Sequence, residues 1–444
     1  MASASRTRSR THSAPRRTNA PPDNGRPASA VRASVTPHLQ ARPGRGGSST
    51  LQRLVLLELA AALAVCGWLL GPVAAVPSVA VAAVLVLLAV VRRRRRWLPE
   101  WLASHLALRA RRRGAARVPV PVPEGIDAGL APAVECEPNL RTYSFVHRDE
   151  HDRRPVGMVG DGGFLTAVLQ VEADAGALRA ERGRRPVPLA LVRDALDVDG
   201  IRLASGQIVL HTQTAPAPHL PRQSVVVANY AQLQSEIAAP AVRIMWIALK
   251  LDPELCPDAV AARGGGLPGA QKCLVRSAEH LSSRLTGAGF RVNLLTEEEV
   301  SSALATSMCA NPMVTVQSGQ DDAPRRRTEE SGRSWRCDNR RHTTYWVRRW
   351  PQLGGQGVGL PQLVAQLTAV PALATTFSLT LAPSGRHDVA ITGHVRVTGR
   401  SSTELADARR GLESVARQAR TGLVRLDREQ LPGLLATLPL GGAR

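Results

Sequence analysis

The sequence predicts an α/β protein in which two N-terminal transmembrane helices form a hairpin and a layered α/β cytosolic domain follows. Three observations predict this fold class. One apolar run, residues 54–91, is too long for a single helix across a membrane. Arginine-rich segments flank that run on both sides. From residue 118 to the end, strand-like and helix-like segments alternate, which favours layers of helices on a sheet.

The first segment, residues 1–50, contains nine arginines and one aspartate among many Ser, Thr and Pro residues. It shows no apolar period, so we expect a disordered basic tail. Residues 92–117 carry ten more arginines and one glutamate, and these two segments hold most of the net charge of +21. The body beyond residue 118 is therefore nearly neutral, which argues against nucleic acid as a partner. The six cysteines form no CxxC pair, which argues against a disulfide or zinc framework.

The next segment, residues 51–92, is predicted to be a transmembrane hairpin. A single helix over residues 54–91 would be roughly 57 Å long at 1.5 Å per residue, whereas the hydrocarbon core of a bilayer is only about 30 Å thick. The sequence "GPVAAVP" at 71–77 places turn-forming residues near the middle of the run. We expect helices at about 51–70 and 75–92. Because both flanks are basic, the positive-inside rule places both termini in the cytosol of a multi-pass protein of the cell (inner) membrane.

Residues 93–117 are predicted to be a basic amphipathic segment at the membrane surface. The arginines that follow the second helix would hold anionic lipid headgroups; they are Arg92, Arg93, Arg94, Arg95 and Arg96. Trp97 and Trp101 stand where aromatic residues mark a membrane interface. Trp101, Leu102, Leu106 and Leu108 share one half of a helical wheel. A nucleic-acid-binding arm is the less favoured alternative for these arginines.

The cytosolic domain is predicted in two parts, residues 118–316 and 334–444, separated by a polar loop at 317–333. Alternating or apolar runs predict strands at 141–147, 162–172, 201–214, 241–251, 342–350, 373–382 and 387–398. Helical spacing and capping signals predict helices at 188–198, 269–290, 296–308, 360–370 and 402–421. No fixed-period repeat is visible.

Three short motifs resemble known sites of chemistry, but none of them has the residues or the setting that the chemistry needs. "HRDEH" at 147–151 matches a zinc-protease pattern but lies in a polar turn rather than on a helix. "GGGLPGAQK" at 264–272 precedes a helix but lacks the GK[ST] of a phosphate-binding loop. "CDNRRH" at 337–342 has no second pair of metal ligands and is expected to be a surface turn. We therefore predict no catalytic residue, no cofactor and no metal.

Three other residues are candidates for contacts with partner proteins. Glu58 is a costly residue within a membrane span and would bond a partner helix, pair with Arg53 or reach the membrane surface. Trp346 and Trp350 lie in "YWVRRWP", where packing in the core and contact with another protein are both open.

The order of these elements resembles the EccE family, a membrane component of actinobacterial type VII (ESX) secretion systems. The resemblance is carried by "RRRRRWLPEW", "RIMWIALKLDPELCPDAVAARGGG", "SWRCDNRRHTTYWVRRWP" and "LATLPLGG", and it covers residues 51–444. It implies a non-enzymatic subunit of a membrane complex with EccB, EccC and EccD. The sequence thus predicts a structural subunit of a secretion machine. The alternative is a membrane-anchored transferase acting on a nucleotide-linked or lipid substrate, with a pocket near Gly264–Gly269.

Overall fold

The computed structural model describes a set of residue ranges that covers most of the chain from Ser48 onward. These ranges are 48–90, 92–93, 96–117, 126–146, 155–173, 186–213, 242–318, 325–352, 359–385 and 388–442. The tail at 1–47, the linker at 118–125 and the "HRDEH" motif at 147–151 therefore lie outside the described residues.

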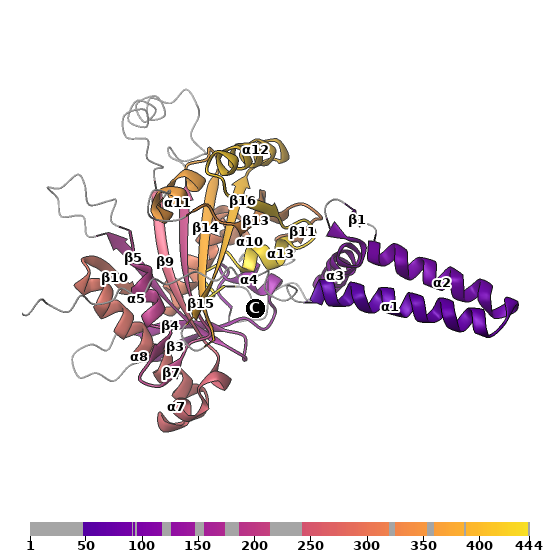
Figure 1. Cartoon of the computed structure of the whole chain (residues 1–444). Coiled ribbons are helices and arrows are strands. Elements are labelled where there is room, and N and C mark those ends of the chain that lie inside the picture. The colour runs from indigo at the N-terminus through magenta and orange to yellow at the C-terminus, as the bar shows by residue number, and fades with distance from the viewer. Residues whose placement is uncertain are drawn as a thin grey trace, which may run out of the picture. The chain divides into compact units, whose positions relative to one another are not determined.

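The described chain begins with a pair of contacting helices, α1 (Ser48–Leu69) and α2 (Pro72–Val90) (Figure 1). The helical pair agrees with the prediction, but the turn is shorter than expected. Gly71 turns with a φ of 100°, a conformation that glycine adopts readily. Pro72 then occupies the first position of α2. Proline lacks an N–H group, but a residue at this position has no hydrogen-bond partner within the helix, so no bond is lost. No helix in the described part of the chain is both long enough and apolar enough to cross a membrane.

A two-stranded ribbon, β1 (Arg92–Arg93) and β2 (Arg96–Trp97), leads from α2 into α3 (Leu98–Arg117). Beyond α3, twelve strands form one sheet in which neighbouring strands are antiparallel. The strands are β3 (Arg141–Val146), β4 (Pro155–Gly160), β5 (Leu165–Ala173), β8 (Ser205–Gln213), β9 (Val242–Leu251), β10 (Phe290–Leu294), β11 (Thr328–Glu330), β12 (Trp335–Cys337), β13 (Arg340–Arg349), β14 (Ala374–Ser384), β15 (Asp388–Gly399) and β16 (Gly422–Arg425). A separate small ribbon pairs β6 (Asp197–Val198) with β7 (Ile201–Arg202). The fold is therefore mixed α/β with a large antiparallel sheet.

The sheet follows the order β11-β12-β13-β15-β14-β8-β9-β5-β4-β3, with β10 beside β5 and β16 beside β13. Strands from both predicted parts of the domain thus belong to one sheet, which β8 and β14 join by pairing from Gly206↔Leu381 to Gln213↔Ala374. Helices fill the connections, and they are α4 (Ala131–Cys136), α5 (Leu189–Asp194), α7 (Pro257–Ala262), α8 (Gly266–Gly287), α9 (Glu297–Ser307), α10 (Pro312–Ser318), α11 (Leu360–Thr368), α12 (Ser402–Gln418) and α13 (Gln430–Leu435). The turn η2 (Pro253–Leu255) precedes α7.

The topology contains an internal duplication. When the β6–β7 ribbon, η2, α7 and α10 are left out, one half runs β3-β4-β5-α5-β8-β9-α8-β10-α9, and the other runs β11-β12-β13-α11-β14-β15-α12-β16-α13. In each half the third strand pairs with the second, fifth and sixth strands, and the fourth pairs with the fifth. The last four strands of each half have the split βαβ arrangement of ferredoxin-like units. The two fourth strands, β8 and β14, pair with each other at the centre of the sheet.

Helices cover both faces of the sheet, so the body has three layers (Figure 1). Helices α5, α8, α11 and α12 pack on one face, which we call the first face, and α4, α9 and α13 pack on the other, the second face. Strand β9 shows how one strand serves both cores. Ile247 and Leu249 point to the first face, whereas Trp246 and Ala248 point to the second. This alternation is the period of two expected of a strand.

Candidate functional site

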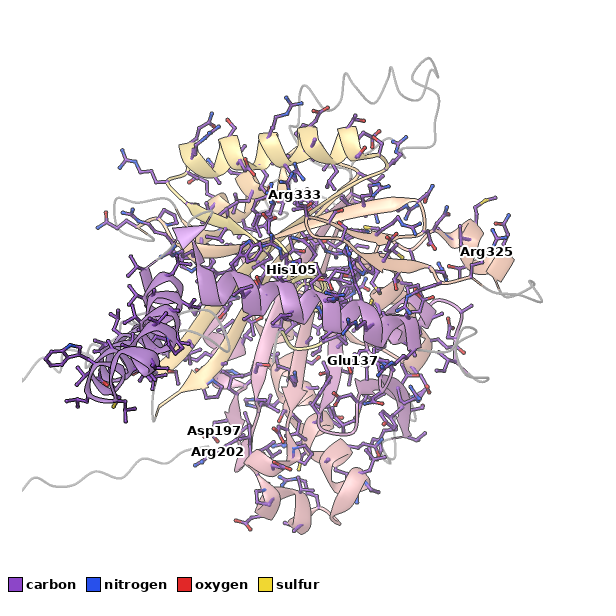
Figure 2. The ribbon with its side chains drawn as sticks, turned by 90° about the vertical axis from the view of Figure 1, so that its right-hand side faces the viewer. His105, Glu137, Asp197, Arg202, Arg325 and Arg333 are labelled. Atoms are coloured by element: carbon purple, nitrogen blue, oxygen red, sulfur yellow. The ribbon has the colours of Figure 1, made fainter. Side chains whose placement is uncertain are left out.

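The structure brings α3 against the edge strand β11, and this junction is the candidate functional site (Figure 2). Arg111 of α3 donates two hydrogen bonds to the Glu330 carboxylate, at 2.9 and 3.0 Å. The neighbouring Arg112 donates to the Glu330 backbone oxygen at 2.9 Å. A bidentate arginine–carboxylate pair fixes orientation as well as charge. Two arginines of α3 therefore attach this helix to the last residue of the edge strand β11.

The side of α3 that contacts the body follows helical spacing. Trp101, Ser104, Leu108 and Arg111 lie three or four residues apart; Ser104 and Leu108 are buried. The Trp101 ring stacks on His105, with 5.5 Å between centroids, and the guanidinium of Arg428 lies 4.8 Å from the Trp101 ring. This contact with a cation of the body orients Trp101 toward protein.

The apolar half-wheel predicted for this segment is thus divided between two sides. Leu108 belongs to the buried side, while Leu102 and Leu106 are exposed. Arg109 and Arg113 continue that exposed stripe at helical spacing. The helical wheel predicts that Leu102, Leu106 and Leu108 lie on one half of the helix. It does not predict which of them contacts the protein, because that depends on the position of β11.

Beneath this junction lies a buried ion-pair network. Arg327 pairs with Asp338 through two bonds of 2.8 and 2.9 Å, and both side chains are almost fully buried. The Glu135 carboxylate of α4 accepts the backbone N–H groups of Arg327 and Thr328 and the Thr328 hydroxyl. These bonds hold α4 against β11 and β11 against the β12–β13 turn, so the strand that receives α3 is itself fixed in place.

A second polar cluster, which was not predicted from the sequence, lies on the second face of the sheet. Arg396 of β15 is fully buried and donates to the carbonyl oxygen of Ser307, the last residue of α9. Its Nε and Nη1 atoms have no hydrogen-bond partner among the described residues. Burial lowers the pKa of Arg396 to about 10. The guanidinium nevertheless faces the negative end of the α9 dipole, which favours a cation at that position.

Two buried histidines accompany Arg396. His211 Nδ1 lies 2.9 Å from the Thr376 hydroxyl, and His342 Nδ1 lies 2.9 Å from the Thr398 hydroxyl. Burial lowers the pKa of His211 to about 3, and the nearby Arg396 charge adds to the shift. Burial also holds the pKa of His342 well below its ordinary value, with a further contribution from Arg396. Both rings are therefore neutral at pH 7. The signal in the sequence was the run His394-Val395-Arg396-Val397-Thr398, in which polar residues alternate with valines within a strand.

The motifs weighed for chemistry have structural roles where the structure describes them. The interpretation of 337–342 as a surface turn was wrong in part, because Cys337 and His342 are buried in the β12–β13 hairpin. Gly264, Gly265 and Gly266 have positive φ, and the N–H groups of Gly264 and Gly265 bond to carbonyl oxygens of α7. Across the described ranges, no group of three or more His, Cys, Asp or Glu residues could hold a metal ion.

The residues predicted to contact lipid or partners are spread over the chain. The side chains of Arg92 to Trp97 lie outside the described set, so their predicted lipid contacts stay predictions. Glu58 is exposed on α1. Trp346 and Trp350 are half-buried. The Trp350 ring packs closely over Gly393 in β15, so it contributes to the core as well as to the surface.

Comparison with known families identifies one segment of the body. Residues 239–347 match the model of the family described as "EccE: Putative type VII ESX secretion system translocon, EccE". This stretch runs from just before β9 into β13 and contains β11 with Glu330 and Arg327. The resemblance predicted from the sequence is confirmed over this segment. None of the curated proteins compared with the chain matches it.

Proposed function

We propose that this chain is a structural membrane subunit of the type VII (ESX) protein secretion machinery. The observation that carries the proposal is the match of residues 239–347 to the EccE family, which is described as a secretion translocon component. In this role the helical pair α1–α2 anchors the α/β body to the inner membrane, with both termini in the cytosol. The body then offers surfaces to the other core subunits, EccB, EccC and EccD.

The packing of α1 and α2 supports a membrane anchor. Among their described side chains, the buried positions are small: Ala60, Gly67, Ala82 and Ala89. Close packing through small residues is typical of helix pairs in lipid. Large apolar side chains instead face outward, as with Trp68 at 79% and Val73 at 90% exposed. An apolar surface of this extent is unfavourable in water and marks a membrane or protein contact.

The exposed stripe of α3 supports contact with anionic headgroups. Leu102 and Leu106 are followed on the same side by Arg109 and Arg113, which gives an apolar and a basic portion facing away from β11. This arrangement suits the boundary between acyl chains and headgroups. The side of α3 with Trp101 and Arg111 meanwhile fixes the body. Anchoring rather than bond chemistry is the mechanism that we propose.

The membrane part of the proposal is tested by carbonate washing and by cysteine labelling of the full chain in vesicles. We expect the protein to stay in the membrane fraction. A single cysteine placed at exposed Arg410 on α12 should be labelled only from the cytosolic side. Release by carbonate, or labelling from the outside, would contradict the anchor.

The assembly part is tested by extraction in a mild detergent and mass spectrometry of the proteins that co-purify. We expect the other core subunits to be recovered with the chain. Glu58→Gln should reduce their recovery because it removes the carboxylate proposed to meet a partner helix. Glu298→Gln, an exposed change on α9, is the matched control. Recovery of the wild-type protein alone would refute the role in a complex.

A further inference from the structure

A cavity of about 810 Å³ lies between α3, α4, α13 and the last described residues of the chain. Ala115 of α3, Cys136 of α4, Leu435 of α13 and Gly442 contribute to its walls. Cavities of about 300–1,000 Å³ are the size that holds small-molecule ligands. We propose that this cavity binds an anionic lipid, with an acyl chain inside and the headgroup at Arg112 and Arg326. The source of the lipid rests on the membrane location proposed above.

The interior of the cavity suits an acyl chain. Phe164, Trp335, Leu140 and Leu440 line it, and all four side chains are buried in the protein. The apolar part of the lining greatly exceeds the polar part. Apolar walls of this kind give water few hydrogen-bond partners, so filling them with hydrocarbon is favourable.

The rim on the α3 side carries positive charge that neutral acceptors do not cancel. Arg326 donates to the backbone oxygens of Ala115, Glu135 and Thr328. Arg112 donates to the backbone oxygen of Glu330. Carbonyl oxygens orient these guanidinium groups but leave their charge in place, so both attract an anion such as a phosphate diester.

Carboxylates also line the cavity, and their own contacts decide where a headgroup can sit. Glu330 is paired with Arg111, and Glu329 is paired with Arg336. Glu135 accepts backbone N–H groups of β11, as described above. Glu137, the residue that follows α4, also lines the cavity. Asp161 and Lys250 also line the cavity, and the Lys250 ammonium lies 4.1 Å from the centre of the Phe164 ring. We place the headgroup on the α3 side because Arg112 and Arg326 donate there to backbone oxygens, which carry no full charge.

The position of the cavity along the chain fits a lipid ligand. Its α3 wall belongs to the helix that begins at Leu98, directly after the β1–β2 ribbon, and α2 ends at Val90. The α3 residues of the wall fall between Arg111 and Ala116, in the second half of that helix. In the proposed orientation α3 lies along the headgroup layer, so the cavity is next to that layer. A water-soluble metabolite would gain nothing from that position.

The test uses the full chain in detergent micelles and lipid with brominated acyl chains, which quench tryptophan fluorescence on contact. Quenching is assigned to Trp335 by comparing the wild type with Trp335→Phe. We expect brominated phosphatidylglycerol to quench Trp335 saturably and brominated phosphatidylcholine to do so more weakly. Unbrominated phosphatidylglycerol should compete, and inorganic phosphate should not.

Two pairs of variants separate the parts of the site. Arg112→Ala should weaken phosphatidylglycerol binding by about fivefold, the effect of one basic residue at an anionic surface. Arg417→Ala, an exposed arginine on α12 that does not line the cavity, is the matched control and should leave it unchanged. Ala116→Phe fills the cavity and should abolish quenching, whereas Ala110→Phe, which does not line it, should not.

The proposal is overturned by any of three results. These are quenching that is the same in Trp335→Phe as in the wild type, equal binding of both lipids with no effect of Arg112→Ala, and competition by inorganic phosphate alone. The quenching is measured on the purified chain without other subunits. Its outcome is therefore independent of whether the chain assembles into a secretion complex.

Discussion

The buried histidines predict that the body loses stability at mildly acidic pH. His211 has an ordinary pKa of 6.5 when the chain is unfolded, and burial lowers it to about 3 in the fold. Between these values the unfolded chain binds a proton that the folded chain excludes. The stabilisation is therefore complete above pH 6.5 and is lost as the pH falls below it.

The size of the loss follows from the shift. One pH unit corresponds to about 1.4 kcal/mol for a single titrating group, so His211 alone costs about 2 kcal/mol between pH 7.5 and 5. His342 is lowered in the same direction and adds to this loss. A change of this size is a large part of the total stability of a typical domain, which is about 5–15 kcal/mol.

The assay is urea unfolding of the full chain in detergent at several pH values, with tryptophan fluorescence as the readout. The ring centroid of Trp246 lies 6.1 Å from that of His211, so it reports on this part of the core. His211→Asn keeps a donor for the Thr376 hydroxyl, lowers stability at every pH and flattens the pH dependence. His105→Asn, on α3 and outside the cluster, is the control. An unchanged pH dependence in His211→Asn would refute the reasoning.

Three further substitutions test other contacts. Glu330→Gln removes the charge partner of Arg111 and should cost about 1–3 kcal/mol; amide exchange in α3 should accelerate, and unchanged exchange would contradict the docking of that helix. Glu329→Gln, whose ion pair is largely exposed, is its control. Arg396→Met removes a buried cation with two unbonded nitrogens. Apolar replacement of buried ions is often neutral or favourable, so thermal unfolding should show unchanged or increased stability. A loss of stability above about 3 kcal/mol would contradict this. Gly157→Ala would place a Cβ 2.3 Å from the backbone of α9 and should destabilise by about 1–3 kcal/mol, whereas Gly287→Ala meets open space and should not.

Local signals in the sequence predicted most of the long helices and strands, but not the short strands β4, β11, β12 and β16. The predicted helix at 296–308 is α9, which begins with a capping box formed by Thr296 and Glu299. The predicted helix at 402–421 is α12, whose N-cap Ser401 accepts the N–H of Glu404. The apolar run at 241–251 is β9, a central strand as expected. Each of these features is encoded within a few neighbouring residues.

The arrangement of the strands could not be read in this way. β8 and β14 pair along most of their length although more than 150 residues separate them in the chain. Their pairing makes one sheet from two halves whose main strands and helices follow the same order but whose sequences show no visible repeat. The same topology requires only the same alternation of apolar and polar positions in the strands. Many different residues satisfy that alternation, so the two halves can share a fold without sharing a sequence. Arg396 could not be predicted as buried for the same reason, because an arginine that alternates with valines in a strand normally faces solvent, and here α9 covers it.

The arginines between residues 109 and 117 serve two different surfaces, and only the fold separates them. Arg111 is directed at the Glu330 carboxylate of β11, whereas Arg109 and Arg113 lie on the exposed stripe with Leu102 and Leu106. Charge removed from the first position changes how α3 holds the body. Charge removed from the others changes what α3 meets outside it. Substitution of Arg111 should therefore change stability, and substitution of Arg109 or Arg113 should change the membrane contact that we propose for the exposed stripe. A segment that acted only as a uniform basic patch would not show this separation.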